Sequence, residues 1–180
     1  MKKQMTKACA VLLYFLTAIS SYSHDVVLDY IAARRDADRL NEVIARQKEA
    51  IKLITKKDRL SYLVNILDEK NAPILAKEAA LFNLYRVSDP SVIPLLLENI
   101  TLSESPTTLT LPAVLLSTYK NEAVPEILEY IEKNTGQQQV LAVKALKLIK
   151  GDGYEGFLKD RWNSLSEKSR NALTFGAVDY

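Results

Sequence analysis

The chain has 180 residues, with 24 lysines and arginines against 22 aspartates and glutamates, one histidine and one cysteine. This near-balance of charge disfavours a nucleic-acid partner, because nucleic-acid-binding domains usually carry a basic excess. With His24 as the only histidine, a Ser-His-Asp or Cys-His arrangement lacks a plausible base, and a Cys/His zinc site lacks ligands. We therefore expect no catalytic residues, no metal site and no cofactor.

The N-terminal residues follow the order of a secretory signal peptide. Three lysines within the first seven residues precede an apolar run that ends at Ile19, and small polar residues follow it. We place the cleavage after Ser23, so that residues 1–23 are the signal peptide and the product is periplasmic or secreted. The apolar run of about 12 residues is shorter than the roughly 20 that a membrane span needs. A retained anchor is the minor alternative, and no span is expected after signal removal.

Removal of this segment changes the charge of the protein. It contains three of the 24 basic residues and none of the 22 acidic ones, so residues 24–180 carry 21 against 22, a formal charge of about −1. Cys9 is removed as well, so disulfides cannot stabilise the product. Stability must come from apolar burial, and the remaining chain is long enough for one sizeable core.

The pattern of apolar residues predicts helices throughout. All five glycines lie between Gly136 and Gly176, and long glycine-free stretches rich in Leu, Ala, Ile, Glu and Lys favour helix. Apolar positions recur at steps of three, four and seven, while the alternation typical of strands is missing. The fold class is therefore all-α. We expect helices over about residues 25–31, 35–55, 58–68, 73–86, 90–101, 108–119, 122–134, 138–150, 153–164 and 167–178, the first of which could continue into the second.

Several helix boundaries have recognisable signals. Asp58 is expected to cap the helix over 58–68, and Asp89 the helix that begins at Pro90, since proline fits the first helical position. The Ser-Glu-Ser-Pro sequence at residues 103–106 marks another break. Short helices joined by tight breaks favour stacked helix pairs over long-rod bundles.

Part of the sequence repeats after about 30 residues. An aliphatic residue followed by proline occurs at Ile93-Pro94 and again at Val124-Pro125, and the turns at residues 119–122 and 149–152 are similarly spaced. A proline in the first helical turn is tolerated because that turn has no internal N–H partners to lose. It also fixes where the second helix of a pair begins.

Residues 77–96 resemble one unit of the HEAT-repeat family in its short bacterial form. They combine an alanine-bearing first helix, an Asp-Pro turn and a second helix with an early proline. The resemblance covers about residues 58–162 and implies a short right-handed solenoid of antiparallel helix pairs that binds proteins. Residues 24–57 and 163–180 would then cap its ends, making residues 24–180 one domain. The glycine usual before the Asp turn is missing, and a tetratricopeptide-like or other helical-hairpin array is the alternative.

Second helices of such pairs usually form an extended concave binding face. The leading hypothesis is therefore an exported interaction module or scaffold that binds another protein through outward-facing residues of these helices. The candidate residues are Asn65, Glu98, Asn99, Glu126, Glu129, Tyr130 and Arg161.

Two alternatives stay open from the sequence. One is an extracytoplasmic inhibitor or immunity-type protein that blocks an enzyme. The other is an enzyme that uses only carboxylates, because Glu122, Glu126 and Glu129 share a helix face and two of them could act as acid and base. A solvated helix face is the simpler interpretation, so we expect no enzymatic activity.

Overall fold

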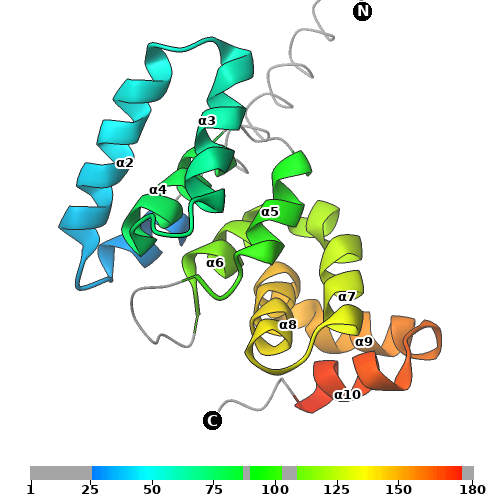
Figure 1. Ribbon diagram of the computed structural model, residues 1–180. Coiled ribbons are helices and arrows are strands. Elements are labelled where there is room, and N and C mark those ends of the chain that lie inside the picture. The colour runs from blue at the N-terminus through cyan, green and yellow to red at the C-terminus, as the bar shows by residue number, and fades with distance from the viewer. Residues whose placement is uncertain (1–25, 87–89, 103–108, 176–180) are drawn as a thin grey trace, which may run out of the picture.

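The computed structural model describes residues 26–86, 90–102 and 109–175, and these ranges contain helices and no strand (Figure 1). The predicted all-α class is thus confirmed. The expected signal peptide, the cap at Asp89 and the break at residues 103–106 lie outside the described residues. After a helical segment over residues 26–32, the α-helices are α2 (Ala37–Lys52), α3 (Lys56–Asp68), α4 (Ile74–Tyr85), α5 (Ile93–Glu98), α6 (Leu111–Thr118), α7 (Val124–Lys133), α8 (Gly136–Lys150), α9 (Tyr154–Arg161) and α10 (Glu167–Phe175).

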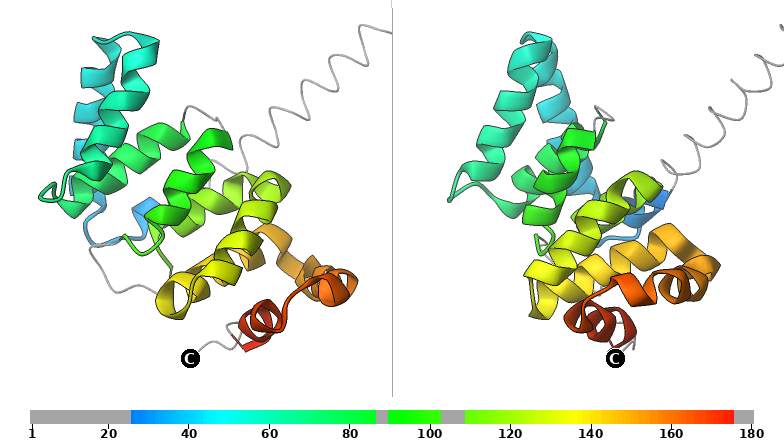
Figure 2. Two further views of the ribbon diagram at one scale, coloured as in Figure 1. Left: turned by 45° about the vertical axis from the view of Figure 1, so that its right-hand side comes forward. Right: turned by 90° about the vertical axis from the view of Figure 1, so that its right-hand side faces the viewer.

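Helices that are close in the chain pack on one another. Both α2 and α3 contact α4, which contacts α6, and α6 in turn contacts α8. In addition, α6 contacts α5 and α8 contacts α7. The helices α5 and α7 also contact each other. The last two helices close the far end, with α9 against α8 and α10 against both α7 and α8 (Figure 2). The central helices therefore form two rows, α4–α6–α8 and α5–α7.

The two innermost helices are recognisable by their composition. In α6 every residue from Leu111 to Leu116 is buried, and α4 is buried without interruption from Glu78 to Leu84. Helices that are apolar on all sides belong in the centre of a helical domain. In contrast, α2 buries a single stripe that includes Leu40 and Ile44, and it faces solvent elsewhere.

A short 3-10 turn precedes each of the helices α5, α7 and α9. These turns are η1 (Pro90–Val92), η2 (Lys120–Ala123) and η3 (Gly151–Gly153), which lead directly into α5, α7 and α9. Their starting points follow one another after 30 and 31 residues, which matches the spacing of the sequence repeat. Adjacent turns are also joined, since Nζ of Lys150 donates to Oδ1 of Asn121 at 2.8 Å.

One local expectation was wrong, and one possibility left open by the sequence is settled. Asp58 does not cap α3, because the cap is Thr55, whose Oγ1 accepts from the backbone N–H of Asp58 at 3.3 Å. Asp58 instead takes the third helical position, and its carboxylate accepts from the Thr55 hydroxyl at 2.5 Å, which resembles a capping box. The helical segment over residues 26–32 does not continue into α2, since a turn over residues 33–36 separates them.

Candidate functional site

The neighbouring helices α5 and α7 enclose a groove that collects four of the seven candidate binding residues. Its volume is about 210 Å³. The four candidates are Glu98, Glu126, Glu129 and Tyr130, and the other three lining residues were not predicted from the sequence. The complete lining consists of Pro94, Leu97, Glu98, Glu126, Glu129, Tyr130 and Lys133.

Helical periodicity explains why these side chains of α7 meet. Glu126 and Tyr130 are one turn apart, as are Glu129 and Lys133, and residues at this spacing are neighbours on a helix surface. The opposite side of α7 faces the core. Its buried residues are Val124, Ile127 and Ile131.

One carboxylate of the groove is already neutralised. Nζ of Lys133 lies 2.5 Å from Oε1 of Glu129, one turn away on α7, and both side chains are largely exposed. The hydrogen bond from Lys133 and its positive charge lower the pKa of Glu129. Exposed pairs of this kind contribute little to stability, so their role here is to reduce the negative charge at one edge of the groove.

Glu126 is the carboxylate whose hydrogen bonding is incomplete. Its side chain is half-buried, and among the described residues its buried Oε2 atom has no hydrogen-bond partner. A buried acceptor without a donor costs roughly 1–3 kcal/mol. This oxygen would gain from a donor supplied by a bound molecule.

Tyr130 contributes an aromatic ring with a hydroxyl group to the same groove. Its ring is half-buried against the core, and burial raises the pKa of its hydroxyl, with a further increase from the negative charge of Glu98. Leu97 is buried beside it, and Pro94 adds an exposed apolar surface. The groove thus combines apolar contact area with two carboxylates, Glu98 and Glu126, that no described cation neutralises by an ion pair.

The remaining three candidates lie elsewhere. Asn65 is exposed on α3, and Asn99 follows α5 but uses its amide nitrogen to donate to the Leu95 carbonyl at 2.9 Å. Arg161 is exposed on α9, with its guanidinium 5.6 Å from the ring centre of Phe157. None of the three lines the groove between α5 and α7. The predicted set is therefore one local cluster and three separate positions.

A larger hollow of about 900 Å³ lies between α8 and α10, but its polar groups mainly serve the structure. The hydroxyls of Ser166 and Ser169 both donate to the Glu132 carboxylate, and Lys168 donates to the Glu132 carbonyl. Gln139 donates to the Ile131 carbonyl at 2.9 Å. The bonds to Glu132 hold α10 against α7, and the bond from Gln139 holds α8 against α7, so size alone does not make this hollow the better site.

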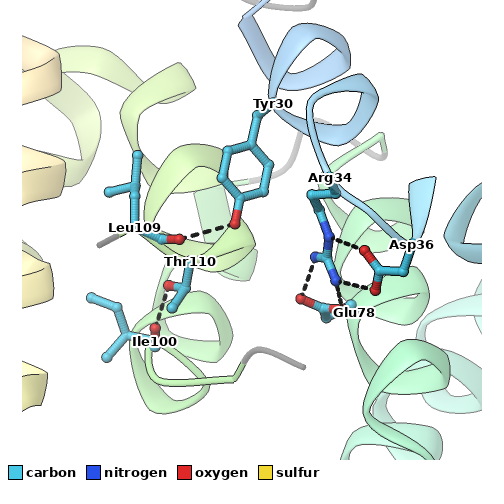
Figure 3. Close-up of polar contacts among 7 residues, drawn as sticks. All are labelled: Tyr30, Arg34, Asp36, Glu78, Ile100, Leu109 and Thr110. Carbon is cyan, nitrogen blue, oxygen red and sulfur yellow. Dashed lines mark hydrogen bonds and ion pairs between the residues drawn. The ribbon is translucent and has the colours of Figure 1, made fainter. Parts of the chain in front are cut away.

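A buried ion-pair cluster joins the N-terminal segment to α4 (Figure 3). The guanidinium of Arg34 contacts Asp36 at 2.6 Å and Glu78 at 2.7 Å, and the Glu78 side chain is fully buried. Burial alone would lower the pKa of Arg34, but hydrogen bonds and attraction from both carboxylates raise it above its ordinary value. The charge on Arg34 is therefore permanent, and the cluster acts as an internal cross-link.

Two further hydrogen bonds extend this anchoring to the start of α6 (Figure 3). The Tyr30 hydroxyl donates to the Leu109 carbonyl at 3.0 Å, and the Thr110 hydroxyl donates to the Ile100 carbonyl at 2.5 Å. They satisfy the backbone carbonyls of Leu109 and Ile100 without creating an accessible site. The segment over residues 26–36 is therefore part of the scaffold.

The described residues hold no group of three or more His, Cys, Asp or Glu side chains placed to bind a metal ion. No helix in the same part of the chain is long and apolar enough to cross a membrane. Glu122, the third carboxylate of the acid–base alternative, lies exposed in η2 and does not line the groove. No protein family, curated protein or solved structure matched the chain.

Proposed function

We propose that this chain is an exported interaction module that binds a basic segment of a partner protein in the groove between α5 and α7. The observation that carries the proposal is the unpartnered, buried Oε2 of Glu126 in a groove that also presents Glu98 and Tyr130. A donor from a partner would complete the hydrogen bonding of Glu126. No reaction is assigned to the groove.

The partner's chemistry follows from the lining. A lysine or arginine side chain can lay its aliphatic stem along Leu97 and the Tyr130 ring while its charged head meets Glu126 and Glu98. Hydrogen bonds between ionised groups are the stronger ones, and a cation over an aromatic face adds attraction. A groove of about 210 Å³ has room for such a side chain as an anchor, with neighbouring contacts made over the surface of α5 and α7.

We further propose that the helix pairs form a short right-handed solenoid of HEAT-like units, exported by the signal sequence over residues 1–23. The two rows of helices support the stacking, and so does the recurrence of the 3-10 turns at Pro90, Lys120 and Gly151. In such an array the second helices form one face, which is where α5 and α7 present the groove. Export would place that face outside the cytoplasm.

The test is capture of the partner from the native host. The protein is expressed from its full reading frame with an affinity tag, and bound proteins are identified by mass spectrometry. Glu126→Lys combined with Glu98→Lys is expected to reduce recovery of the partner at least about tenfold, since leaving a buried charged pair broken costs several kcal/mol. The melting temperature should change little, because Glu98 is exposed and Glu126 makes no hydrogen bond through Oε2.

The matched control makes the same change in net charge at two residues outside the groove. Glu69 and Glu155 are both exposed, after α3 and on α9, outside the groove lining. Glu69→Lys combined with Glu155→Lys should leave the recovery of the partner unchanged. Equal recovery with the groove variant and the control would overturn the assignment of the groove.

A further inference from the structure

The hairpin formed by α2 and α3 ends in an exposed apolar tip, which we define as residues 48–60. Leu53 at the connection is 88% exposed, the highest value of any large hydrophobic side chain in the described ranges, and Leu60 on α3 is 45% exposed. Both views in Figure 2 and the view in Figure 1 show this hairpin projecting from the rest of the molecule. Leu53 and Leu60 therefore lie outside the core, whereas Ile51 packs against its edge.

The same tip concentrates positive charge. Residues 48–60 contain five lysines and arginines against Glu49 and Asp58, a formal charge of +3, whereas the rest of residues 24–180 carries about −4. Lys48 is exposed, and Lys52 is exposed with its Nζ 2.6 Å from Glu49. Arg59 is half-buried and donates through Nε to the Ile54 carbonyl at 3.3 Å, which fixes the connection beside Leu53.

From this arrangement we propose that the hairpin tip docks on an anionic lipid bilayer and inserts Leu53 between the headgroups. Apolar side chains flanked by lysine and arginine match the two components of an interfacial membrane site, which are acyl-chain contact and attraction to anionic headgroups. Leu60 lies in the second turn of α3, about 6 Å along the helix from its start. That distance is within the roughly 5–10 Å to which interfacial segments enter.

The shape and charge of the tip favour a membrane over other partners. The tip projects from the molecule, and a projection can enter the deformable surface of a bilayer, which needs no preformed cavity to receive it. An acidic protein would have to offer such a cavity. A second copy docked tip to tip would bring two formal charges of +3 together, and like charges repel. Docking of the tip on the acidic remainder of a second copy is the outcome that the measurement without vesicles detects. The expected docking is peripheral, since no helix in the described ranges is long and apolar enough to cross a membrane.

The size of the effect follows from the two components. Burying a leucine side chain contributes enough for Leu53→Ser to lower the vesicle partition coefficient about tenfold. Charge reversal by Lys48→Glu combined with Lys52→Glu should lower the partition coefficient by at least about a further tenfold. Each basic residue near an anionic surface strengthens binding severalfold, and the reversal replaces this attraction by repulsion. Higher salt should weaken binding, since this attraction is screened beyond the Debye length.

The experiment places a fluorescent reporter at the tip. The variant Leu53→Trp is made together with Trp162→Phe and expressed from the full reading frame. It is purified in the processed or unprocessed form that the cell produces. It is mixed with vesicles of phosphatidylcholine alone or of phosphatidylcholine with phosphatidylglycerol, with and without brominated acyl chains. Only the anionic vesicles should shift its emission to the blue and allow bromine to quench it. The matched control carries Leu148→Trp with Trp162→Phe, because Leu148 on α8 is 47% exposed but distant in the chain from the tip.

Each other outcome overturns the proposal. Unchanged emission with anionic vesicles would show that the tip does not insert. An equal shift with neutral vesicles would show that charge does not direct the binding. Quenching of the Leu148→Trp control to the same extent would show that the N-terminal segment draws the whole chain to the vesicle. A concentration-dependent shift without vesicles would indicate self-association, and capture of an acidic protein that Leu53→Ser abolishes, without vesicle binding, would indicate a protein partner. Leu53→Ser, which lies outside the groove lining, should capture the groove partner normally, so the tip and the groove are tested separately.

Discussion

Lys120 and Gly151 share a positive φ, of 52° and 50°, at the turns that precede α7 and α9, and Gly151 combines it with a ψ of −134°. Each follows a helix, α6 or α8, and opens the 3-10 turn that leads into the next helix, α7 or α9. A side chain in this region strains the backbone, whereas glycine is free to adopt it. The turn before α9 therefore has a residue suited to a positive φ, Gly151, whereas the turn before α7 has Lys120, which is not suited to it.

Exchanging these residues should change stability in opposite directions. We expect Lys120→Gly to raise the free energy of unfolding by about 0.5–1 kcal/mol and Gly151→Ala to lower it by about 1–2 kcal/mol. A Cβ at residue 151 would meet no atom within 4 Å, so any loss comes from the backbone. Urea denaturation measures both. Gly156→Ala in α9 is the control, since helix propensity should make it stabilising, and a loss at Gly156 equal to that at Gly151 would contradict the explanation.

Removal of Arg34 should be among the most destabilising single changes. Arg34→Met leaves Asp36 and the fully buried Glu78 without their cation, and breaking a buried pair in this way costs about 3–5 kcal/mol. Chemical denaturation measures the loss. Arg46→Met, which breaks the exposed pair with Glu42, is the control and should cost little. Similar losses in the two variants would show that burial does not determine the effect.

The same cluster should make stability sensitive to acid. The hydrogen bond from Arg34 lowers the pKa of Asp36 below its ordinary value of 3.8. Because the folded-state pKa is the lower one, this contribution is complete above pH 3.8 and is lost as the pH falls through the folded-state pKa. Asp36→Asn should therefore reduce the slope of unfolding free energy against pH below about pH 4. An unchanged slope would assign the acid sensitivity to other carboxylates.

Glu126 should show a trade-off between stability and binding. Glu126→Met removes a buried acceptor that has no partner among the described residues, so the free energy of unfolding should rise by about 1 kcal/mol. Thermal unfolding and partner capture are measured on the same preparations. Glu129→Met, on the exposed edge, should leave stability nearly unchanged. Lower stability in Glu126→Met would mean that the carboxylate has a stabilising role.

The attachment of α10 should depend on Glu132. Hydrogen bonds from Ser166 and Ser169 lower the pKa of the Glu132 carboxyl, and both residues lie at the start of α10. Glu132→Ala is expected to speed hydrogen exchange of the α10 amides without affecting α6, because local openings differ in cost between parts of a fold. Mass-spectrometric exchange gives this resolution. Equal protection of α10 in both proteins would show that the Glu132 carboxylate is not needed to hold it.

Local patterns in the sequence predicted the helices well, since each helix forms from residues close in the chain. The uninterrupted apolar character of α6 and the prolines that open α5 and α7 are examples. Capping was less predictable: Thr55 and Asp58 are both good capping residues, and only the backbone geometry shows that Thr55 takes this role.

Contacts between residues far apart in the chain could not be predicted from the sequence. The contact between Arg34 and Glu78 spans 44 positions, and no local pattern indicates it. The groove was partly predictable, because Glu126, Glu129 and Tyr130 share one face of a single helix. Lys133 could have been added from its one-turn spacing to Glu129. Pro94 and Leu97 required knowledge of how α5 lies against α7.

The two connections of residues 26–36 to the rest of the chain have a consequence for how folding proceeds. Most helices contact neighbours along the chain and can form early, because closing short loops costs little entropy. The Tyr30 hydroxyl, by contrast, meets the Leu109 carbonyl 79 positions away, after α4, α5 and the start of α6 are in place. Residues 26–36, which are synthesised before the elements that they contact, are thus expected to be among the last to reach their native position.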